Sequence, residues 1–392
     1  MMTELTNPPS VDDYSALSID EFRALVREWI EANYPAEKRF IVSRIGMDEI
    51  GDWVRMLGRK GWLCPSWPRE WGGMGLPIRK QIVMMEEMAR YGCARYPDQA
   101  INHVGPLLMH FGTEAQKARH LPKIASGEEI WCQGYSEPGA GSDLASLQCK
   151  AVADGDDFIV TGEKIWTTLA TCADWIFALV RTDNSGKKQQ GITMLLIDLR
   201  SPGVSVRPIE SFTGEVEFAQ VIFDAVRVPK ANVVGAVNEG WTIAKSVLGH
   251  ERVIVGAPII AMTALRQLEH LAEAIGAFAD QSFVDRYAEL RLELHGLTNL
   301  FESFVQRIED GDEIGADVSL LKIVATELQA RISEEIMSLA GDAARIARPI
   351  ELPGMIVDPI GLYAAARVPT IYGGANEVQR NLIAKAVLQL PS

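Results

Sequence analysis

The stretch of the chain best suited to binding a ligand is a glycine-bearing segment, QGYSEPGAGSD, at residues 133–143. Gly139 and Gly141 carry no side chain, so the backbone there can approach a ligand closely. A dinucleotide-binding fingerprint would add a third glycine, a following helix and an acidic residue about twenty positions later. Strand signals follow instead, which argues against nicotinamide binding. An ordinary glycine-rich turn remains the alternative for this segment taken alone.

A second segment, TGEKIWTTLATCADW at residues 161–175, offers an aromatic ring beside a hydroxyl group. Trp166 and Thr168 are two positions apart, so on a regular strand they point to one face. This pairing suits a flat heteroaromatic ligand, which the ring can stack on while the hydroxyl forms a hydrogen bond. The alternative is a surface Trp–Thr pair on a sheet, which is common.

A third segment, TIYGGANEVQRNLIAKAVL at residues 370–388, places a double glycine before an amphipathic helix. Asn376 or the glycine pair can begin that helix and leave free N–H groups for an anionic or polar ligand. The alternative here is a plain helix start.

Three zones of the chain must position these segments. The first zone contains two capping boxes, Ser18 with Glu21 and Thr113 with Gln116, before helical patterns. The second contains apolar or alternating runs separated by turns such as Asp154-Gly155, with no helical crossovers. We therefore expect an α+β multidomain chain with an N-terminal all-α domain (1–128), a middle antiparallel β-barrel or sandwich domain (129–233) and a C-terminal four-helix bundle (234–392). The helical runs expected in the last domain are 240–275, 283–308, 317–346 and 363–388.

Composition excludes several classes of function. The chain has 392 residues and a net charge of −14, and nucleic-acid binding requires a basic face. Its five cysteines include no CxxC pair, which indicates reduced thiols and no metal site. The polar, acidic N-terminus does not resemble a targeting peptide, and the apolar run 253–262 is too short to span a membrane. We expect a cytoplasmic protein with no membrane or nucleic-acid partner.

Taken together, the motifs resemble those of the acyl-CoA dehydrogenase family. The resemblance is carried by YSEPGAGSD (135–143), GEKIWTT (162–168) and IYGG-x-x-E-x-QR (371–380). WPREWGGMG (67–75) and NEGW-x-x-A-K-x-x-L-x-x-ER (238–252) are also similar to family segments. The resemblance extends over nearly the whole chain.

The resemblance implies a fold, a cofactor and a reaction. The family has a helical, a β and a four-helix-bundle domain, which matches the three zones, and binds FAD. A carboxylate removes the α-proton of an acyl-CoA thioester while the β-hydride passes to flavin N5, giving a trans-2-enoyl-CoA. The electrons then leave to an electron-transfer flavoprotein.

The resemblance also assigns roles to individual residues. Substrate binding falls to Ser142 and Arg252, and the backbone N–H of Gly373 polarises the thioester carbonyl. The residues implied to bind FAD are Gln133, Tyr135, Ser136, Gly141, Ser142, Trp166, Thr168, Tyr372, Gly374 and Glu377.

The chain departs from the family at the catalytic base. Most members read Tyr-Glu-Gly in the C-terminal motif, and that glutamate is the base, whereas this chain reads Tyr372-Gly373-Gly374. Two branches of the family carry the base on the first bundle helix, in a Glu-Arg pair that Glu251-Arg252 matches. Glu251 also shares a helix face that is otherwise apolar, where a carboxylate is costly unless a site uses it. We therefore expect Glu251 to be the base; a solvated helix residue is the alternative.

A second departure concerns the neighbouring subunit. Segments from a partner chain usually hold the FAD adenosine in this family, but the matching regions here read GAFADQSFVD (276–285) and SLAGDAARIA (338–347). Only Gly341 is preserved. Either a homotetramer or homodimer holds FAD differently, or the partner is a homologous chain in an α2β2 heterotetramer.

Two other functions stay open from the sequence. One is a flavin oxidase or monooxygenase on the same fold, and the other is a non-catalytic partner subunit of a heterotetrameric acyl-CoA dehydrogenase. Trp166, Thr168 and Glu251 argue against the silent subunit, and the Glu251-Arg252 pair argues against a monooxygenase.

Overall fold

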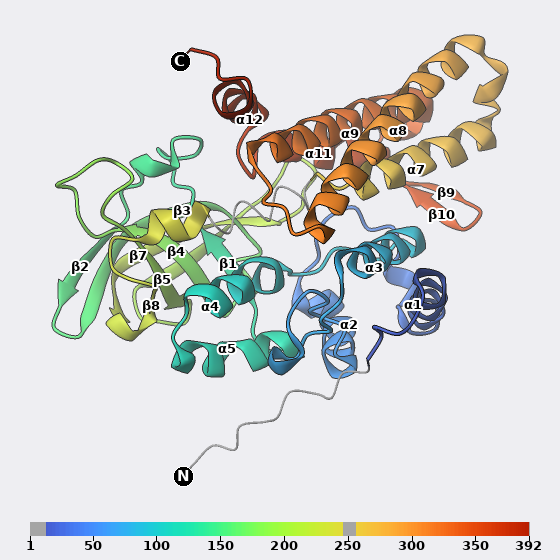
Figure 1. Ribbon diagram of the computed structural model, residues 1–392. Coiled ribbons are helices and arrows are strands. Elements are labelled where there is room, and N and C mark those ends of the chain that lie inside the picture. The colour runs from blue at the N-terminus through green and yellow to red at the C-terminus, as the bar shows by residue number, and fades with distance from the viewer. Residues whose placement is uncertain (1–12, 246–255, 392) are drawn as a thin grey trace. The chain divides into compact units, whose positions relative to one another are not determined.

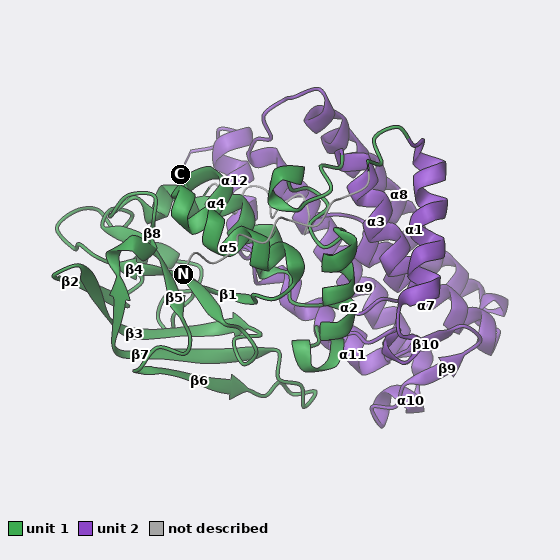
Figure 2. Cartoon of the chain, turned by 90° about the horizontal axis from the view of Figure 1, so that it is seen from below, with its two compact units in different colours: residues 1–16, 44–76, 96–247 green, residues 17–43, 77–95, 248–392 purple. Residues whose placement is uncertain are grey.

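The structure is a computed structural model that describes residues 13–245 and 256–391. Contacts group the chain into two compact units, drawn in green and purple in Figure 2. Unit 1 comprises residues 1–16, 44–76 and 96–247, and unit 2 comprises residues 17–43, 77–95 and 248–392. Each unit therefore gathers segments that lie far apart in the sequence.

The described part of unit 1 contains an eight-stranded sheet, visible in Figure 1. Its strands are β1 (Trp131–Gly134), β2 (Lys150–Asp154), β3 (Asp157–Thr168), β4 (Trp175–Arg181), β5 (Ile192–Asp198), β6 (Val204–Ile209), β7 (Phe218–Pro229) and β8 (Val233–Val234). The strand order is β6-β7-β3-β2-β4-β5-β8, and β1 pairs with β4. The expected middle domain of strands is confirmed.

Most pairings in the sheet are antiparallel, because short turns join consecutive strands into hairpins. The predicted turn at Gly155 joins β2 to β3, with Asp154 opposite Asp157. Two pairings differ from the expected antiparallel pattern: β1 runs parallel to β4, and β2 meets β4 in parallel at a single register position. β1 enters the sheet from a helical segment instead of a hairpin, so no turn imposes an antiparallel direction on it. β4 is buried along its whole length.

The helices described in unit 1 include α2 (Met47–Lys60), α4 (Gly105–Phe111) and α5 (Glu114–Ser126). The Gln116 side chain of α5 donates to the Ala231 and Val233 carbonyls, each at 2.8 Å, and so ties this helix to the sheet at β8. The predicted capping box begins α5: Thr113 Oγ1 accepts from the Gln116 N–H at 3.2 Å, and the Gln116 side chain accepts from the Thr113 N–H at 3.0 Å. Trp62 and Trp67 are fully buried, and Trp67 Nε1 donates to the Ile101 carbonyl at 2.9 Å. These rings therefore pack in the core of unit 1.

Unit 2 is mainly helical. Its elements are α1 (Ile19–Asn33), α3 (Ile78–Tyr91), α7 (Ile259–Ile275), α8 (Gln281–Glu309), α9 (Ser319–Ala340), α10 (Asp342–Arg345), β9 (Ile350–Leu352), β10 (Met355–Val357), α11 (Pro359–Arg367) and α12 (Asn376–Leu382). The capping box predicted at Ser18 and Glu21 begins α1. Leu268 of α7, Phe301 of α8 and Leu328 of α9 belong to one buried apolar cluster.

Two of the expected helical runs are broken where the chain contains helix-breaking residues. Residues 240–245 are helical, but residues 256–258 are not, and α7 begins only after Pro258. The expected run 363–388 is divided by Gly373 and Gly374, which separate α11 from α12. Among the described residues, no helix combines the length and the hydropathy that crossing a bilayer needs.

Candidate functional site

The glycine-bearing segment leaves the sheet at the end of β1 and returns against β3. Tyr135 is buried, with its ring edge-on to Phe177 at 5.7 Å between centroids. Ser136 is half-buried, and its carbonyl accepts a hydrogen bond from the Ile165 N–H at 2.9 Å. The structure therefore brings Ser136 beside the residue that precedes Trp166.

Trp166 lies at a β-bulge near the end of β3. Lys164 pairs with Val221 and Thr167 with Ala219, so three steps along β3 match two along β7. Trp166 has a φ of 59°, a left-handed conformation that is strained for a bulky residue. Trp166 is 59% exposed, whereas Thr167 is buried and Thr168 is half-buried. The simple strand parity used to place Trp166 and Thr168 does not apply across a bulge.

Two buried polar atoms near these residues lack a hydrogen-bond partner in the described part of the chain. They are Nε2 of Gln133, on β1, and Oγ1 of Thr167, on β3. A buried donor left unpaired is costly, so such atoms call for a ligand or an ordered water. The unpaired atoms and the exposed indole fit a ligand with a flat aromatic system and polar edges.

The turn that follows Ser136 is open. Glu137 and Ala140 exchange backbone hydrogen bonds of 3.0 and 3.1 Å, and Ser142 is exposed. A Cβ added at Gly139 or Gly141 would meet no atom of the chain within 4 Å, and neither residue has a positive φ. The fold itself therefore does not require glycine at these positions, whereas close approach of a ligand would.

In unit 2, the double glycine forms a turn before α12. Gly373 and Gly374 have φ of 63° and 84°, which favour glycine, and α12 begins at Asn376 with Ala375 as its N-cap. Tyr372 is half-buried, and Glu377 is exposed on the first turn of α12. A residue with a side chain at position 373 or 374 would therefore strain the backbone of this turn.

Buried side chains that the sequence interpretation assigned no role hold this turn. The side-chain amide of Gln379 donates to the Gly373 and Gly374 carbonyls, each at 3.1 Å. Its side-chain oxygen accepts from Ser319 Oγ at 2.7 Å. Lys322 is 1% exposed and also donates to the Gly374 carbonyl. Gln379 belongs to the C-terminal motif, so the motif contained the signal; Lys322 lies on α9, and no local pattern singles it out.

The expected base and one expected substrate-binding residue, Glu251 and Arg252, lie outside the described residues. Upstream on the same predicted helix, Ile243 and Ala244 are buried. The assignment of Glu251 therefore stays a prediction.

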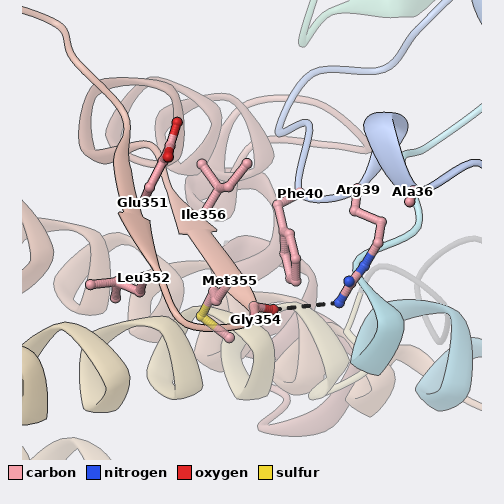
Figure 3. Close-up of a pocket in the computed structure, with 8 residues that line it drawn as sticks. All are labelled: Ala36, Arg39, Phe40, Glu351, Leu352, Gly354, Met355 and Ile356. Carbon is pink, nitrogen blue, oxygen red and sulfur yellow. Dashed lines mark hydrogen bonds between the residues drawn. The ribbon is translucent and has the colours of Figure 1, made fainter.

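Two pockets of unit 2 contain none of the predicted site residues. One, of about 370 Å³, lies between residues 36–40 and the β9–β10 hairpin, where Arg39 donates to the Gly354 carbonyl at 3.4 Å (Figure 3). The other, of about 460 Å³, is bordered by Glu87, which is 1% exposed.

Glu87 accepts hydrogen bonds from three arginines. Burial alone would raise the pKa of Glu87, but the hydrogen bonds from Arg27, Arg90 and Arg23 outweigh burial and lower it to about 2. We interpret this cluster as a structural ion-pair network between α1 and α3.

Comparison with known proteins identifies relatives over the whole length. Three family models match: "Acyl-CoA dehydrogenase, N-terminal domain" at residues 18–128, "middle domain" at 132–226 and "C-terminal domain" at 238–388. The acyl-CoA dehydrogenase IpdE1 of Mycobacterium tuberculosis is 36% identical over 95% of this chain and 98% of its own length.

Solved structures show the same similarity. The structure named "Tcur3481-Tcur3483 steroid ACAD" has a TM-score of 0.87 and 34% identity, over 97% of this chain and 100% of that one. The ChsE4-ChsE5 complex from Mycobacterium tuberculosis has a TM-score of 0.82 and 31% identity, over 96% of this chain and 99% of that one.

Proposed function

Because the chain belongs to the acyl-CoA dehydrogenase family of oxidoreductases, we propose that it binds FAD and dehydrogenates an acyl-CoA thioester to the trans-2-enoyl-CoA. The family consists of flavoproteins in general. The observation that carries the proposal is the exposed, strained Trp166 on β3, together with the unpaired buried polar atoms of Thr167 on the same strand and of Gln133 on β1. Strained backbone conformations of this kind cost stability, and they are typical of functional sites.

The residues of unit 1 fit the flavin by their chemistry. Trp166 offers an aromatic face for stacking, and Thr168, Ser136 and Gln133 offer polar groups for the edges of the ring system. Gly141 and Ser142 lie in the open turn, where the backbone can approach the cofactor phosphates or the pantetheine arm. From unit 2 we assign Tyr372, Gly374 and Glu377 to cofactor binding. When bound, FAD supplies the acceptor for the β-hydride at N5.

The proton chemistry falls to Glu251. A carboxylate removes the α-proton efficiently if it lies in a water-poor site, where burial raises its pKa toward the working pH. The Gly373 N–H donates to the thioester carbonyl as charge develops on that oxygen. Arg252 and Ser142 bind the CoA portion. The glycine turn leaves the space beside the reacting carbons free of a side chain at position 373, so the base comes from a different helix.

We propose a branched or ring-bearing acyl group as substrate. Gly373, Gly374 and Ala375 remove side-chain volume next to the thioester, and a solved relative is named a steroid ACAD. Electron-transfer flavoprotein is the proposed electron acceptor.

Two solved relatives are named as two-chain assemblies, Tcur3481-Tcur3483 and ChsE4-ChsE5. We therefore propose that this chain pairs with a homologous chain. Because one chain of such a pair can be silent, the non-catalytic partner subunit remains the second candidate function.

Anaerobic titration of the purified yellow protein with a panel of acyl-CoAs tests the proposal. Bleaching of the flavin by a branched or ring-bearing acyl-CoA is the expected result. A protein that binds FAD, is bleached by no acyl-CoA and shows no activity with its homologous partner would contradict it. Turnover that requires oxygen would favour the oxidase or monooxygenase.

A further inference from the structure

Unit 1 contains an ion pair that is buried on both sides and that the proposed chemistry does not use. Lys164, on β3, is 0% exposed, and Glu137, in the glycine-bearing segment, is 8% exposed. Lys164 Nζ lies 2.7 Å from Glu137 Oε1. Neither residue was assigned a role from the sequence, although each stands within one of the family motifs.

The pair connects three separate pieces of backbone. Lys164 also donates to the Tyr135 carbonyl at 3.2 Å, so it holds the glycine-bearing segment at the residue before Ser136 as well as at the residue after it. The Glu137 carboxylate accepts from the backbone N–H groups of Gln148, at 2.6 Å, and Cys149, at 3.0 Å. The glycine-bearing segment is thereby fastened both to β3 and to the residues that lead into β2.

A buried ion pair is a poor source of stability, because the cost of removing both charges from water offsets their attraction. Apolar residues of similar size would hold the same strands together as well or better. Charged hydrogen bonds differ from apolar contacts in being short and directional. The Lys164–Glu137 pair therefore fixes the geometry of the backbone around it. A neighbouring residue that must be held in one position would explain why the pair is there.

Each residue of the ion pair lies close to a proposed flavin-binding residue in the sequence. Ser136 lies between Tyr135 and Glu137, the two residues that Lys164 contacts. On β3, Lys164 is the last residue in register before the bulge that contains Trp166. The hydrogen bond from the Ile165 N–H to the Ser136 carbonyl completes the connection between the two sides.

We propose that Lys164 and Glu137 are positioning residues that hold Ser136 at a fixed place relative to Trp166, so that the two sides fit one flavin ring. The inference rests on the proposed function, because it presupposes that FAD binds to these residues. Neither side chain touches the reacting atoms. Without the pair, the backbone hydrogen bond from Ile165 to Ser136 is left to hold the bulge and the segment together, and FAD binds more weakly and in an altered environment.

The test compares Lys164→Met with the double variant Lys164→Met/Glu137→Gln in the full chain. FAD affinity is measured by fluorescence titration of the apoprotein, together with the visible spectrum of the bound flavin and amide exchange of the apoprotein. Lys164→Met should raise the FAD dissociation constant by on the order of 10–100-fold, by analogy with metal ligands that lose the partner that orients them. The Ile165, Gln148 and Cys149 amides should exchange faster.

The double variant separates positioning from stability and provides a folded protein if Lys164→Met does not fold. It leaves no unpaired buried charge, so its melting temperature should recover toward the wild type while FAD affinity and spectrum stay altered. Recovery of FAD binding together with stability would overturn the positioning role.

Glu129→Gln is the matched control, because Glu129 is 7% exposed and pairs with buried His120 at 2.8 Å in the same unit. It should lower stability without the spectral change. An equal spectral change in Glu129→Gln would also overturn the inference. A wild-type protein that takes up no FAD would contradict the proposed function. If the wild type binds FAD and Lys164→Met has the same FAD affinity and flavin spectrum, only the positioning role is contradicted.

Discussion

At the scale of single residues, Trp166 combines three unfavourable properties. Its φ is 59°, the residue is 59% exposed, and it occupies a bulge, where the ladder of β3 and β7 is interrupted. The ring meets that of Phe218 edge-on, at 6.2 Å between centroids. Trp166 therefore contributes little to the fold, and its cost is best explained by a ligand that covers the ring.

Trp166→Ala should weaken FAD retention because the stacking face is lost. Aromatic contacts contribute about 0.5–1.5 kcal/mol beyond the burial of area, so the dissociation constant should rise roughly 2–12-fold or more. Fluorescence titration of the apoprotein measures this change. Val152→Ala, which removes another exposed apolar side chain of unit 1, is the control and should bind as the wild type does. Equal affinity of Trp166→Ala and the wild type would exclude stacking on Trp166.

Glu87 provides a prediction on pH dependence. Its pKa falls from an ordinary 4.5 to about 2 in the folded protein, so its charge stabilises the fold above pH 4.5 and this contribution is lost as the pH falls toward 2. Glu87→Gln removes the carboxylate that three half-exposed arginines share, although Arg23 keeps Glu86 and Arg90 keeps Glu31, and should cost about 1–3 kcal/mol at neutral pH. The difference from the wild type should shrink on acidification.

Urea unfolding at neutral pH and at several acidic pH values measures this effect. Glu86→Gln is the control on the same helix: Glu86 is 30% exposed in its pair with Arg23, so its loss should cost less than about 1 kcal/mol. A loss for Glu87→Gln that does not change with pH would show that charge is not the cause.

At the scale of elements, the turn before α12 has a conformation that depends on glycine. The sequence predicted the elements that carry strong local signals: both capping boxes and the β2–β3 hairpin. It did not predict the bulge at Trp166, because φ above zero is disfavoured for tryptophan and only the pairing with β7 imposes it. Gln379, a buried partner of the turn, lies within the C-terminal motif, whereas Lys322 comes from a distant helix and leaves no local pattern.

Gly374→Ala should destabilise unit 2. At a φ of 84° the new Cβ is strained and would lie 2.5 Å from Nε2 of Gln379, which holds the turn. The left-handed conformation alone costs about 1–2 kcal/mol. Gly276→Ala, at a φ of 72° with no atom within 4 Å of the new Cβ, isolates that strain and should cost less. Equal losses in urea unfolding would show that the contact with Gln379 is unimportant.

At the scale of the whole molecule, composition and the order of helical and β zones were sufficient to predict the fold class. The division of the chain at residues 128 and 233 stays a prediction. The oligomeric assembly is harder to predict from the sequence of one chain, because the segments that would hold FAD across a dimer lack the family pattern, apart from Gly341. Unit 2 nevertheless exposes large apolar side chains near its C-terminal end, at Ile371, Leu388 and Leu390.

We expect these apolar residues to be covered by a partner chain. Light scattering should show an oligomer, and co-expression with a homologous chain should give a mixed assembly that contains FAD. Leu388→Asp with Leu390→Asp should shift the distribution toward smaller species without loss of secondary structure. A monomer with a full complement of FAD would contradict this expectation.

The identity of the base tests the account most directly. Anaerobic single-turnover mixing with an acyl-CoA that bleaches the wild type should be repeated with Glu251→Gln, which keeps the shape and removes the proton acceptor. We predict that Glu251→Gln retains FAD and binds the acyl-CoA, yet reduces the flavin more slowly by a factor on the order of 10²–10⁴, the contribution of a positioned base. Bleaching of Glu251→Gln at the wild-type rate would contradict this prediction.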